Sequence, residues 1–442
     1  MSLPTIYKIT PYWMQNMMIS LKGWFIKRRR FGVEFNRQLL FYNNNNFQKI
    51  DNDQLRSFMK EAEKTKFWAR KFIEFGVDVA ADDLISEISK LPVLTKKEVV
   101  LHADEIMNNP VGEQIMVTNS SGTTGSGLVF QQTRTMENKQ WAVWWRYRER
   151  LGLSLNEWSG WFGGRSIISV GQEYPPYWRI NYPMKQVMFS AHHLNTDTAI
   201  TYYEEIKKRK LRWLHGYPSQ LALLASLIKD LELTPLKMSW ITTGAENLLA
   251  HQIAIIKEMF GVIPFQHYGL AEGVANISQM PDGTFEVDHD FSFVEFIKAK
   301  HDESIFHLVG TNYCNTAFPL IRYDTNDLVR LEVVNGKSRV ISIDGRNEDY
   351  ITLPNGVKLG RLDHIFKNAD YVNEAQLHQV DLSNIILRIV KGKNYTVKVH
   401  EPQILSECRE RFGYEVNLII EYVESIPKTQ SGKLKFVISD IK

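Results

Sequence analysis

A loop of hydroxyl-bearing and glycine residues near position 120 has the composition needed to bind phosphate. Its residues are, in order, Ser120, Ser121, Gly122, Thr123, Thr124, Gly125, Ser126 and Gly127. Glycines let backbone N–H groups approach a ligand closely, and hydroxyls add hydrogen-bond donors for phosphate oxygens. The strand-like run 114–118 precedes the loop, so the alternative interpretation is a simple glycine-rich turn between strands.

The residues after this loop exclude two common classes of phosphate-binding protein. The loop lacks the lysine of a Walker P-loop, and the apolar residues 128–130 follow where a helix would have to begin. A phosphate loop between two strand-like runs therefore points away from P-loop NTPases and from Rossmann dehydrogenases.

Four further segments contain residues suited to nucleotide chemistry. Residues 268–272 place an aromatic ring and a carboxylate one helical turn apart, and residues 321–328 form an acidic turn. Residues 345–349 follow that turn, and residues 427–433 end in a Gly-Lys pair. Together with the loop, and in this order, these segments resemble the motifs of the adenylate-forming superfamily, which includes acyl-CoA synthetases, luciferases and peptide-synthetase adenylation domains.

The forms YGLAEG and FPLIRYDTNDL make the resemblance more specific. They are similar to the phenylacetate–CoA ligase branch, particularly to its relatives linked to capsule and cell-surface polysaccharide synthesis. The resemblance extends over roughly residues 90 to 435. It implies a large N-terminal domain of layered α/β sheets, residues 1–347, and a small mobile C-terminal α+β domain, residues 348–442.

The activity that the resemblance implies is attack of a carboxylate on the α-phosphate of ATP. This reaction gives an acyl adenylate and pyrophosphate, and it requires the site to bring two anions together with Mg²⁺. Transfer of the acyl group to coenzyme A is the expected second step. Transfer to an amine or hydroxyl of a surface sugar is the alternative, and a degenerate protein that only binds nucleotide or a partner is the third possibility.

The resemblance assigns the nucleotide contacts to particular residues. The loop residues Ser121, Thr123 and Thr124 would hold the β- and γ-phosphates. Tyr268, followed by Gly269, would stack on adenine, an arrangement that aromatic rings make well with bases. The wall of the adenine pocket would be the segment Gly244, Ala245 and Glu246.

Acidic residues complete the predicted nucleotide site. Glu272 would bind Mg²⁺, since hard cations prefer carboxylate ligands. Asp327 would accept hydrogen bonds from both ribose hydroxyls, and Asp324 is the competing candidate. Arg346 would lie near the phosphates and ribose, and Glu348 at the hinge between the domains.

Two positions depart from the pattern of the relatives. Ala271 occupies a position where relatives often carry a small hydroxyl residue, so any polar contact from it is lost. Asn326 replaces the glycine that usually precedes the ribose aspartate. Because asparagine tolerates the left-handed conformation, we expect the turn to survive.

Lys433 is the predicted catalytic lysine. It follows Gly432, where the backbone can bend and let the amine reach into a site. Its ammonium group would contact the carboxylate and the α-phosphate, and so stabilise charge in the transition state. The resemblance implies that Lys433 reaches the active site only when the small domain closes. Rotation about the hinge would then withdraw the lysine for the second half-reaction.

Periodicity predicts the elements that position these residues. Helical spacing occurs at 53–75, 96–107, 197–210 and 219–231, with a capped helix start at 94–98. Strand patterns occur at 167–170, 239–243, 292–297, 304–309, 328–334, 385–390, 395–400 and 417–422. Alternation of strands and helices in the middle of the chain predicts layered α/β sheets.

The acid-binding pocket is less clearly marked. Residues 161–164 and 215–219 combine aromatic rings with tight turns, which suits an apolar pocket, although a core aromatic cluster explains them equally well. The histidines at positions 192, 193, 215, 267 and 289 have no metal-ligand spacing, so we expect structural roles for them.

Composition limits the remaining choices. The 442 residues suffice for two or more domains, and 53 basic against 50 acidic side chains give no reason to expect nucleic acid as a partner. The only cysteines, Cys314 and Cys408, cannot build a disulfide framework, which favours a reducing, cytoplasmic location. No apolar run is long enough to span a membrane.

Residues 11–30 allow two interpretations. The stretch is rich in Trp, Met, Ile and Leu and ends in four basic residues, 27–30. It could rest as an amphipathic segment on an anionic membrane surface. We favour an ordinary helix packed on the core with a solvated basic end.

Overall fold

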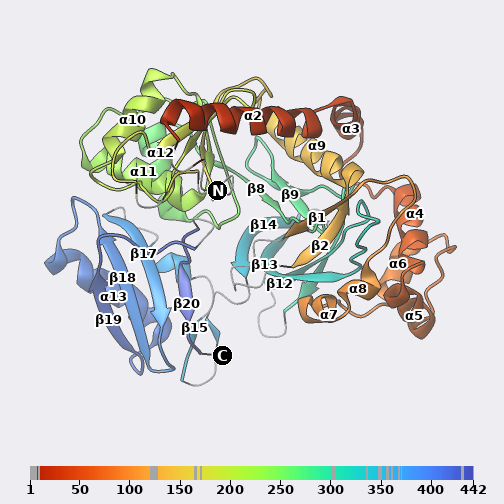
Figure 1. Ribbon diagram of the computed structural model, residues 1–442. Coiled ribbons are helices and arrows are strands. Elements are labelled where there is room, and N and C mark those ends of the chain that lie inside the picture. The colour runs from red at the N-terminus through yellow and green to blue at the C-terminus, as the bar shows by residue number, and fades with distance from the viewer. Residues whose placement is uncertain are drawn as a thin grey trace. The chain divides into compact units, whose positions relative to one another are not determined.

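The computed structural model describes most of the chain (Figure 1). The described residues are 7, 10–119, 128–163, 167–169, 172–299, 305–334, 337–346, 351–354, 358–359, 362–366, 369, 371–429 and 433–441. The chain folds into two compact units. Unit 1 consists of residues 1–25, 156–266 and 347–442, and unit 2 consists of residues 26–155 and 267–346.

An antiparallel sheet forms the centre of unit 2. Its strands follow the order β11 (Phe293–Lys298), β12 (Ile305–Thr311), β13 (Tyr323–Val334), β14 (Lys337–Arg346), β10 (Phe285–Val287), β9 (Asn276–Gln279) and β8 (Phe265–Gly269). The strands predicted at 292–297, 304–309 and 328–334 are therefore confirmed. Side chains from neighbouring strands, such as Ile277, Leu308 and Val329, are buried in one hydrophobic cluster.

Most helices of unit 2 begin at a residue whose side chain caps them. The helices are α3 (Val33–Asn44), α4 (Asn52–Glu63), α5 (Lys66–Phe75), α6 (Leu84–Ser89), α7 (Lys96–Leu101), α8 (Ala103–Ile106) and α9 (Arg134–Arg150), and α3 and α8 are the exceptions in this set. The predicted helix start at 94–98 is confirmed, because Thr95 and Glu98 form a reciprocal capping box at α7. Thr133 caps α9 by accepting a hydrogen bond from the N–H of Met136.

A separate ribbon in unit 2 flanks the glycine-rich loop. It pairs β1 (Ile115–Asn119) antiparallel with β2 (Val129–Thr133), and Asn119 lies opposite Val129. The strand-like runs on both sides of the loop are thus confirmed. The loop residues 120–127 themselves lie outside the described part of the chain.

A mostly parallel sheet forms the central part of unit 1. Its strand order is β7 (Trp240–Gly244), β6 (Trp213–Gly216), β3 (Ser159–Phe162), β5 (Gln186–Phe189) and β4 (Trp178–Asn181), and only β4 runs antiparallel to its neighbour. The helices beside these strands are α10 (Ala199–Lys208), α11 (Pro218–Asp230) and α12 (Ala250–Phe260) (Figure 1). Both helices predicted for this region, and the strand at 239–243, are confirmed.

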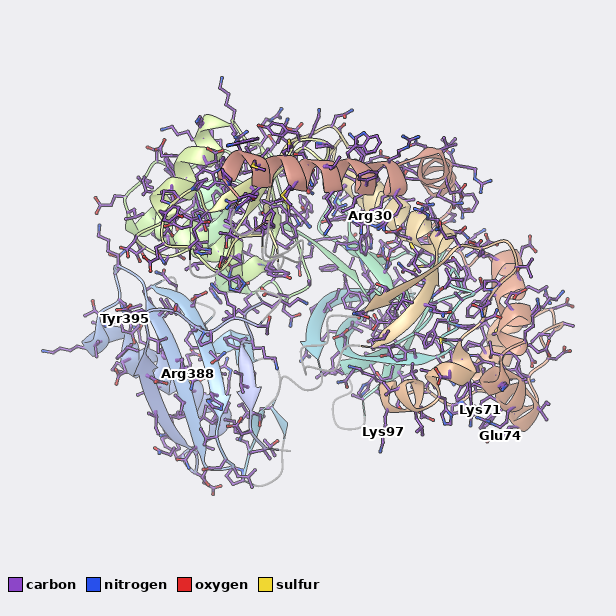
Figure 2. The ribbon with its side chains drawn as sticks, in the orientation of Figure 1. Arg30, Lys71, Glu74, Lys97, Arg388 and Tyr395 are labelled. Atoms are coloured by element: carbon purple, nitrogen blue, oxygen red, sulfur yellow. The ribbon has the colours of Figure 1, made fainter. Side chains whose placement is uncertain are left out.

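The C-terminal part of unit 1 has the predicted α+β pattern. Its main sheet has the order β19 (Asn417–Tyr422), β18 (Asn384–Lys391), β17 (Val372–Gln379) and β20 (Val437–Ser439). Helix α13 (Val397–Phe412), the 3₁₀ helix at Leu362–Phe366 and the short pair β15 (Ile351–Thr352) and β16 (Lys358–Leu359) accompany it. Figure 2 shows Arg388 on β18, where its guanidinium lies 3.0 Å from Glu421 of β19.

Two predicted strands are wrong. Residues 395–400 alternate apolar and polar side chains, but they lead into α13, because Ile404, Cys408 and Phe412 bury one face at helical spacing. In the run 167–170, the described residues 167–169 are not a strand. Ile167 and Ile168 are nevertheless buried, so the apolar run reflects burial rather than strand pairing.

The N-terminal segment forms helix α2 (Tyr12–Arg30). The expected helix is therefore present. Its buried residues are not large apolar ones but Gln15, Asn16 and Gly23. Within the described residues, no helix combines the length and apolar character needed to cross a bilayer.

Candidate active site

In unit 2, Tyr268 and Asp327 meet although 59 positions separate them in the chain. The Tyr268 hydroxyl at the end of β8 donates a hydrogen bond of 2.6 Å to Oδ2 of Asp327 in β13. Asp327 is 7% exposed. Burial raises the pKa of Tyr268 well above its usual value, and the charges of Asp327 and Glu272 raise it further. The tyrosine therefore stays protonated and acts as the donor.

A bulge in β13 presents Asp327 at this position. The register between β12 and β13 shifts between His307 and Val309, and Asn326 has a φ of 61°. The expectation that Asn326 tolerates a left-handed turn is confirmed. The N–H of Asp327 donates to Oγ1 of Thr325 at 3.1 Å, which stabilises the bulge.

The same bulge separates the roles of the two competing aspartates. Oδ1 of Asp324 accepts a hydrogen bond of 2.8 Å from the N–H of Asn326, so this carboxylate closes the local turn. The carboxylate of Asp327 instead faces the phenol of Tyr268. The two aspartates therefore have different partners, and the ribose role of Asp327 stays a prediction.

Glu272 lies in the turn that follows β8, and two buried amides hold this turn. Nδ2 of Asn312 donates to the carbonyl of Glu272 at 3.0 Å, and Nε2 of Gln140 donates to the carbonyl of Leu270 at 2.8 Å. Both amide side chains are buried, and Asn312 is fully so. Sequence reasoning missed these positioning residues, because nothing in the chain distinguishes them from other surface-type amides.

Glu272 supplies a carboxylate suited to a magnesium ion bound together with a nucleotide, and Asp327 is the carboxylate predicted to bind the ribose. Both are largely buried, and both act on the same phenol. Mg²⁺ is commonly held by one or two carboxylates together with substrate phosphates and water. Among the residues that the structure describes, no group of three or more His, Cys, Asp or Glu side chains could hold a metal by itself. The donor set therefore fits a metal that arrives with phosphate.

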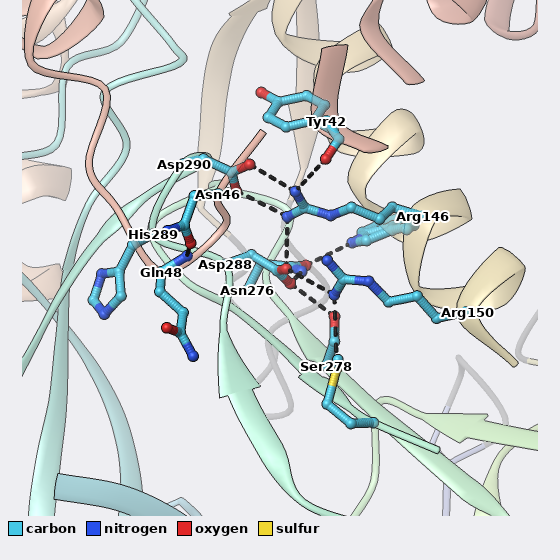
Figure 3. A network of polar contacts seen from close by, with 12 residues as sticks. Tyr42, Asn46, Gln48, Arg146, Arg150, Asn276, Ser278, Asp288, His289 and Asp290 are labelled. Carbon is cyan, nitrogen blue, oxygen red and sulfur yellow. Dashed lines mark hydrogen bonds and ion pairs between the residues drawn. The ribbon is translucent and has the colours of Figure 1, made fainter. Parts of the chain in front are cut away.

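A buried polar network supports the strand that carries Tyr268 (Figure 3). Oδ1 of Asn276 accepts from Nε2 of His267 at 2.9 Å, and its Nδ2 donates to Asp288 at 2.5 Å. Asp288 in turn pairs with the fully buried Arg146 at 2.6 Å, which also pairs with Asp290. Arg150, 3.9 Å from Asp288, supplies a second positive charge. Two guanidinium groups thus face two carboxylates, so the network can be buried, and it ties β8 and β9 to α9.

Unit 1 contains a second group of predicted site residues. The carboxyl ends of β3, β6 and β7 lie at one edge of the parallel sheet, and Gly163, Tyr217 and Ala245 follow them directly. This edge is where open parallel sheets bind their ligands. The structure thus brings together three segments that the sequence suggested independently.

Glu246 is the charged centre of this second group. Its carboxylate accepts a hydrogen bond of 3.3 Å from the N–H of Ser219 in the first turn of α11, and one of 2.9 Å from the N–H of Leu434. Ala245 beside it has a φ of 67°, which is strained for a residue with a Cβ. Burial raises the pKa of Glu246, while the two N–H donors and the charge of Lys433 oppose that rise.

Lys433 lies next to these groups within unit 1. Its Nζ is 5.8 Å from the centre of the Tyr217 ring. Its backbone N–H donates to Oγ1 of Thr429 at 3.0 Å, and the N–H of Thr429 donates back to its carbonyl at 2.9 Å. Nearby, Lys428 pairs with the buried Glu374 at 3.3 Å. Two hydrogen bonds to Thr429 therefore fix the backbone of Lys433.

The suggested acid pocket is only partly consistent with the structure. Phe162 is fully buried and stacks on Phe189 with ring centres 4.7 Å apart, so it belongs to the core. An added Cβ at Gly216 would lie 2.1 Å from the carbonyl oxygen of Phe162, which explains the glycine by strand packing. Trp161, His215 and Tyr217 are partly exposed near the carboxyl edge and remain candidates.

Other predicted residues cannot be placed completely. Arg346 ends β14 and lies opposite Asp327 in the strand register, but its side chain is outside the described part. The same holds for the whole of Glu348 and of the loop residues Ser120, Ser121, Gly122, Thr123, Thr124 and Gly125. Their roles stay predictions.

Solved structures define the class to which this architecture belongs. The chain is similar to 2-hydroxyisobutyryl-CoA ligase in the postadenylation state in complex with R3-HIB-AMP, with a TM-score of 0.67 and 16% identity over 88% of this chain and 89% of that one. An open conformation of that ligase, in complex with 2-HIB-AMP and CoA, gives a TM-score of 0.53 at 15% identity over 88% and 90% of the two chains. The chain therefore has the fold of the adenylate-forming acyl-CoA ligases, as its motifs predicted.

Sequence similarity identifies a more particular relative. Over 99% of both chains, this protein is 27% identical to Protein CapK of Staphylococcus aureus. Residues 353–440 match the family model described as the CapK C-terminal domain. The resemblance to the capsule-linked relatives is thus found in both comparisons.

Proposed function

We propose that this protein is an AMP-forming acid ligase. An oxygen of a carboxylic acid attacks the α-phosphorus of ATP, and the bond from that phosphorus to the bridging oxygen breaks. Pyrophosphate leaves with the electron pair, and an acyl adenylate remains. The observation that carries the proposal is the Tyr268–Asp327 hydrogen bond with Glu272 beside it, at motif positions and in this fold.

The proposed roles follow from the chemistry of each group. Tyr268 stacks on adenine, and Asp327 accepts hydrogen bonds from the ribose. Glu272 holds Mg²⁺, which would supply positive charge at the phosphates. Lys433 contributes an ammonium group near the reacting carboxylate, and the loop from Ser120 to Gly125 binds the outer phosphates through its N–H groups.

We propose two alternative acceptors for the acyl group. Coenzyme A is the first candidate, and its thiol sulfur would attack the acyl carbon and displace AMP. An amine or hydroxyl of a cell-surface sugar is the second candidate, which is favoured by the similarity to Protein CapK and by the CapK C-terminal domain at 353–440. That domain includes Lys433. We also propose that the boundary between the two domains lies between residues 347 and 348. The proposed location of the protein is the cytoplasm.

A pyrophosphate-exchange screen tests this function. Aromatic, fatty and amino acids would each be incubated with ATP, Mg²⁺ and labelled pyrophosphate, and at least one acid should give exchange. Product analysis by mass spectrometry, with coenzyme A or with amino sugars present, then distinguishes the two acceptors. If ATP binds but no acid supports exchange, the protein is a nucleotide-binding relative without this activity.

A further inference from the structure

Helix α2 exposes several large apolar side chains, although Ile19 packs against the hydrophobic core of unit 1. The large apolar residues on its solvent side are Trp13, Met17, Leu21, Trp24 and Phe25, each between 45% and 64% exposed. Their spacing of three or four positions, with Phe25 adjacent to Trp24, places them on one side of the helix. An isolated exposed apolar residue is ordinary, but a continuous stripe of this kind indicates an interaction site.

The inner side of α2 makes several polar contacts, and these set the rotation of the helix. Oδ1 of Asn16 accepts from the N–H of Ile180 at 2.9 Å, and Oε1 of Gln15 accepts from Nε of Arg179 at 2.5 Å. Oγ of Ser20 donates to the carbonyl of Ile180 at 3.2 Å. These side chains therefore pair with the free backbone edge of β4 and with its arginine.

Gly23 lies on the inner side of α2, where the helix contacts β4. A Cβ at this position would lie 2.0 Å from Oδ1 of Asn181, so the helix backbone approaches β4 closely at this point. Rotation would leave Asn16, Gln15 and the edge of β4 without partners. The exposed stripe is therefore a stable feature of unit 1.

The charges of α2 indicate what covers the stripe. The helix contains no acidic residue, and its basic residues are Lys22, Lys27, Arg28, Arg29 and Arg30. Glu137 pairs with Arg29 and Arg30, the latter labelled in Figure 2, whereas Lys22 is exposed beside the stripe. Tryptophan, aliphatic side chains and basic groups on one helix are the combination that binds the surface of an anionic bilayer.

We propose that α2 is a peripheral membrane anchor. It lies parallel to the bilayer, with Trp13, Met17, Leu21 and Trp24 inserted among the lipid headgroups of an anionic leaflet. Lys22, Lys27 and Arg28 attract that leaflet electrostatically. The anchor would hold the enzyme at a membrane surface without spanning it, and it is independent of which acid is activated.

Vesicle flotation of the full-length protein tests the anchor. The protein should float with vesicles of phosphatidylcholine and phosphatidylglycerol, and much less with phosphatidylcholine alone. The Met17→Gln/Leu21→Gln variant should lose at least about tenfold in partition coefficient, because two inserted apolar side chains are removed. Lys22→Gln should lose about fivefold, and only with the anionic vesicles.

A matched control removes exposed apolar surface elsewhere. Ile73→Gln/Leu101→Gln replaces residues that are 85% and 74% exposed on other helices, and it should float like the wild type. Light scattering and thermal unfolding should show that every variant is folded and has the wild-type mass. Absence of flotation, or equal loss in the control, overturns the proposal. A wild-type dimer that Met17→Gln/Leu21→Gln dissociates also overturns it, in favour of a second copy.

Discussion

At the scale of single residues, the Tyr268 hydroxyl donates a hydrogen bond to Asp327. The ribose hydroxyls of a nucleotide would have to bind Asp327 in addition to this donor or in its place. A ribose offers two hydroxyl donors, and a buried carboxylate can accept both. The phenol therefore orients Asp327 before the ligand arrives, and this reduces the ordering that binding requires.

Asp327→Ala is expected to weaken ATP binding at least about a hundredfold, since two hydrogen bonds to a charged acceptor contribute roughly 3 kcal/mol or more. Calorimetric titration with ATP measures the loss. Glu332→Gln removes an exposed carboxylate from the same strand and should bind ATP normally. Equal affinity in Asp327→Ala and the wild type would mean that the ribose binds elsewhere.

Lys433→Met should affect the two half-reactions differently. Removing one preorganised charged group should slow acyl-adenylate formation by about 10²–10³. The same variant, supplied with a presynthesised acyl adenylate, should still transfer the acyl group to its acceptor. Lys435→Met is the matched neighbouring control. Loss of both half-reactions in Lys433→Met would assign the lysine a structural role in the turn with Thr429 instead.

At the scale of elements, irregular backbone positions the site while regular strands supply rigidity. The bulge in β13 and the left-handed Ala245 after β7 both interrupt otherwise regular pairing. Such conformations persist only where the surrounding structure holds them. In β13, the side chains of Asp324 and Thr325 do so by accepting hydrogen bonds from the N–H groups of Asn326 and Asp327.

Asn326→Val tests the bulge. A β-branched residue at a φ of 61° should cost about 1–3 kcal/mol of stability, and it should displace Asp327 and weaken ATP binding. Asn326→Gly places at this φ a residue that adopts it without strain, and it should retain both stability and binding. Urea unfolding and ATP titration measure the two effects. A valine variant as stable as the glycine variant would show that the turn is not strained.

Arg146→Met tests the buried network. The variant leaves Asp288 and Asp290 without their guanidinium, and it should lose about 3–5 kcal/mol of unfolding free energy. Arg70→Ala breaks the exposed pair with Glu105 and should cost about 1 kcal/mol or less. Urea denaturation compares the two. Similar small losses would mean that water reaches the aspartates and replaces the missing charge.

At the scale of the whole molecule, both units contain a histidine that folding keeps neutral. Burial lowers the pKa of His251 in unit 1 and of His267 in unit 2 to about 4. The unfolded chain, with histidine pKa values near 6.5, binds more protons than the native state between these limits. The native state therefore loses stability as the pH falls.

Stability should be complete above about pH 6.5 and should decrease toward pH 4, by about 1–3 kcal/mol for each of the two histidines. Urea unfolding at a series of pH values measures this decrease. His251→Asn should make the dependence shallower, because one of the two protonation sites is removed. A flat profile across this window would show that these histidines are hydrated in the folded protein.

Local patterns determined much of what the sequence alone could predict. The capping box at Thr95 and the left-handed Asn326 depend on neighbouring residues, so one segment is enough to predict them. The fold was predicted from the order of five motifs along the chain, each of which is a local pattern. The strand assigned to 395–400 failed because its alternation is local, whereas the buried stripe of α13 faces a core formed by distant residues.

Only the tertiary structure decided which distant groups meet. The pairing of Tyr268 with Asp327, the amides of Asn312 and Gln140 behind Glu272, and the contact of Glu246 with the turn at Lys433 all join segments far apart in the chain. The sequence left two interpretations of residues 11–30 open, and only the structure showed which side of α2 contacts the edge of β4 and which side is exposed. Burial and long-range hydrogen bonds are properties of the folded chain, and they set both the electrostatics of the site and the surface left free for a partner.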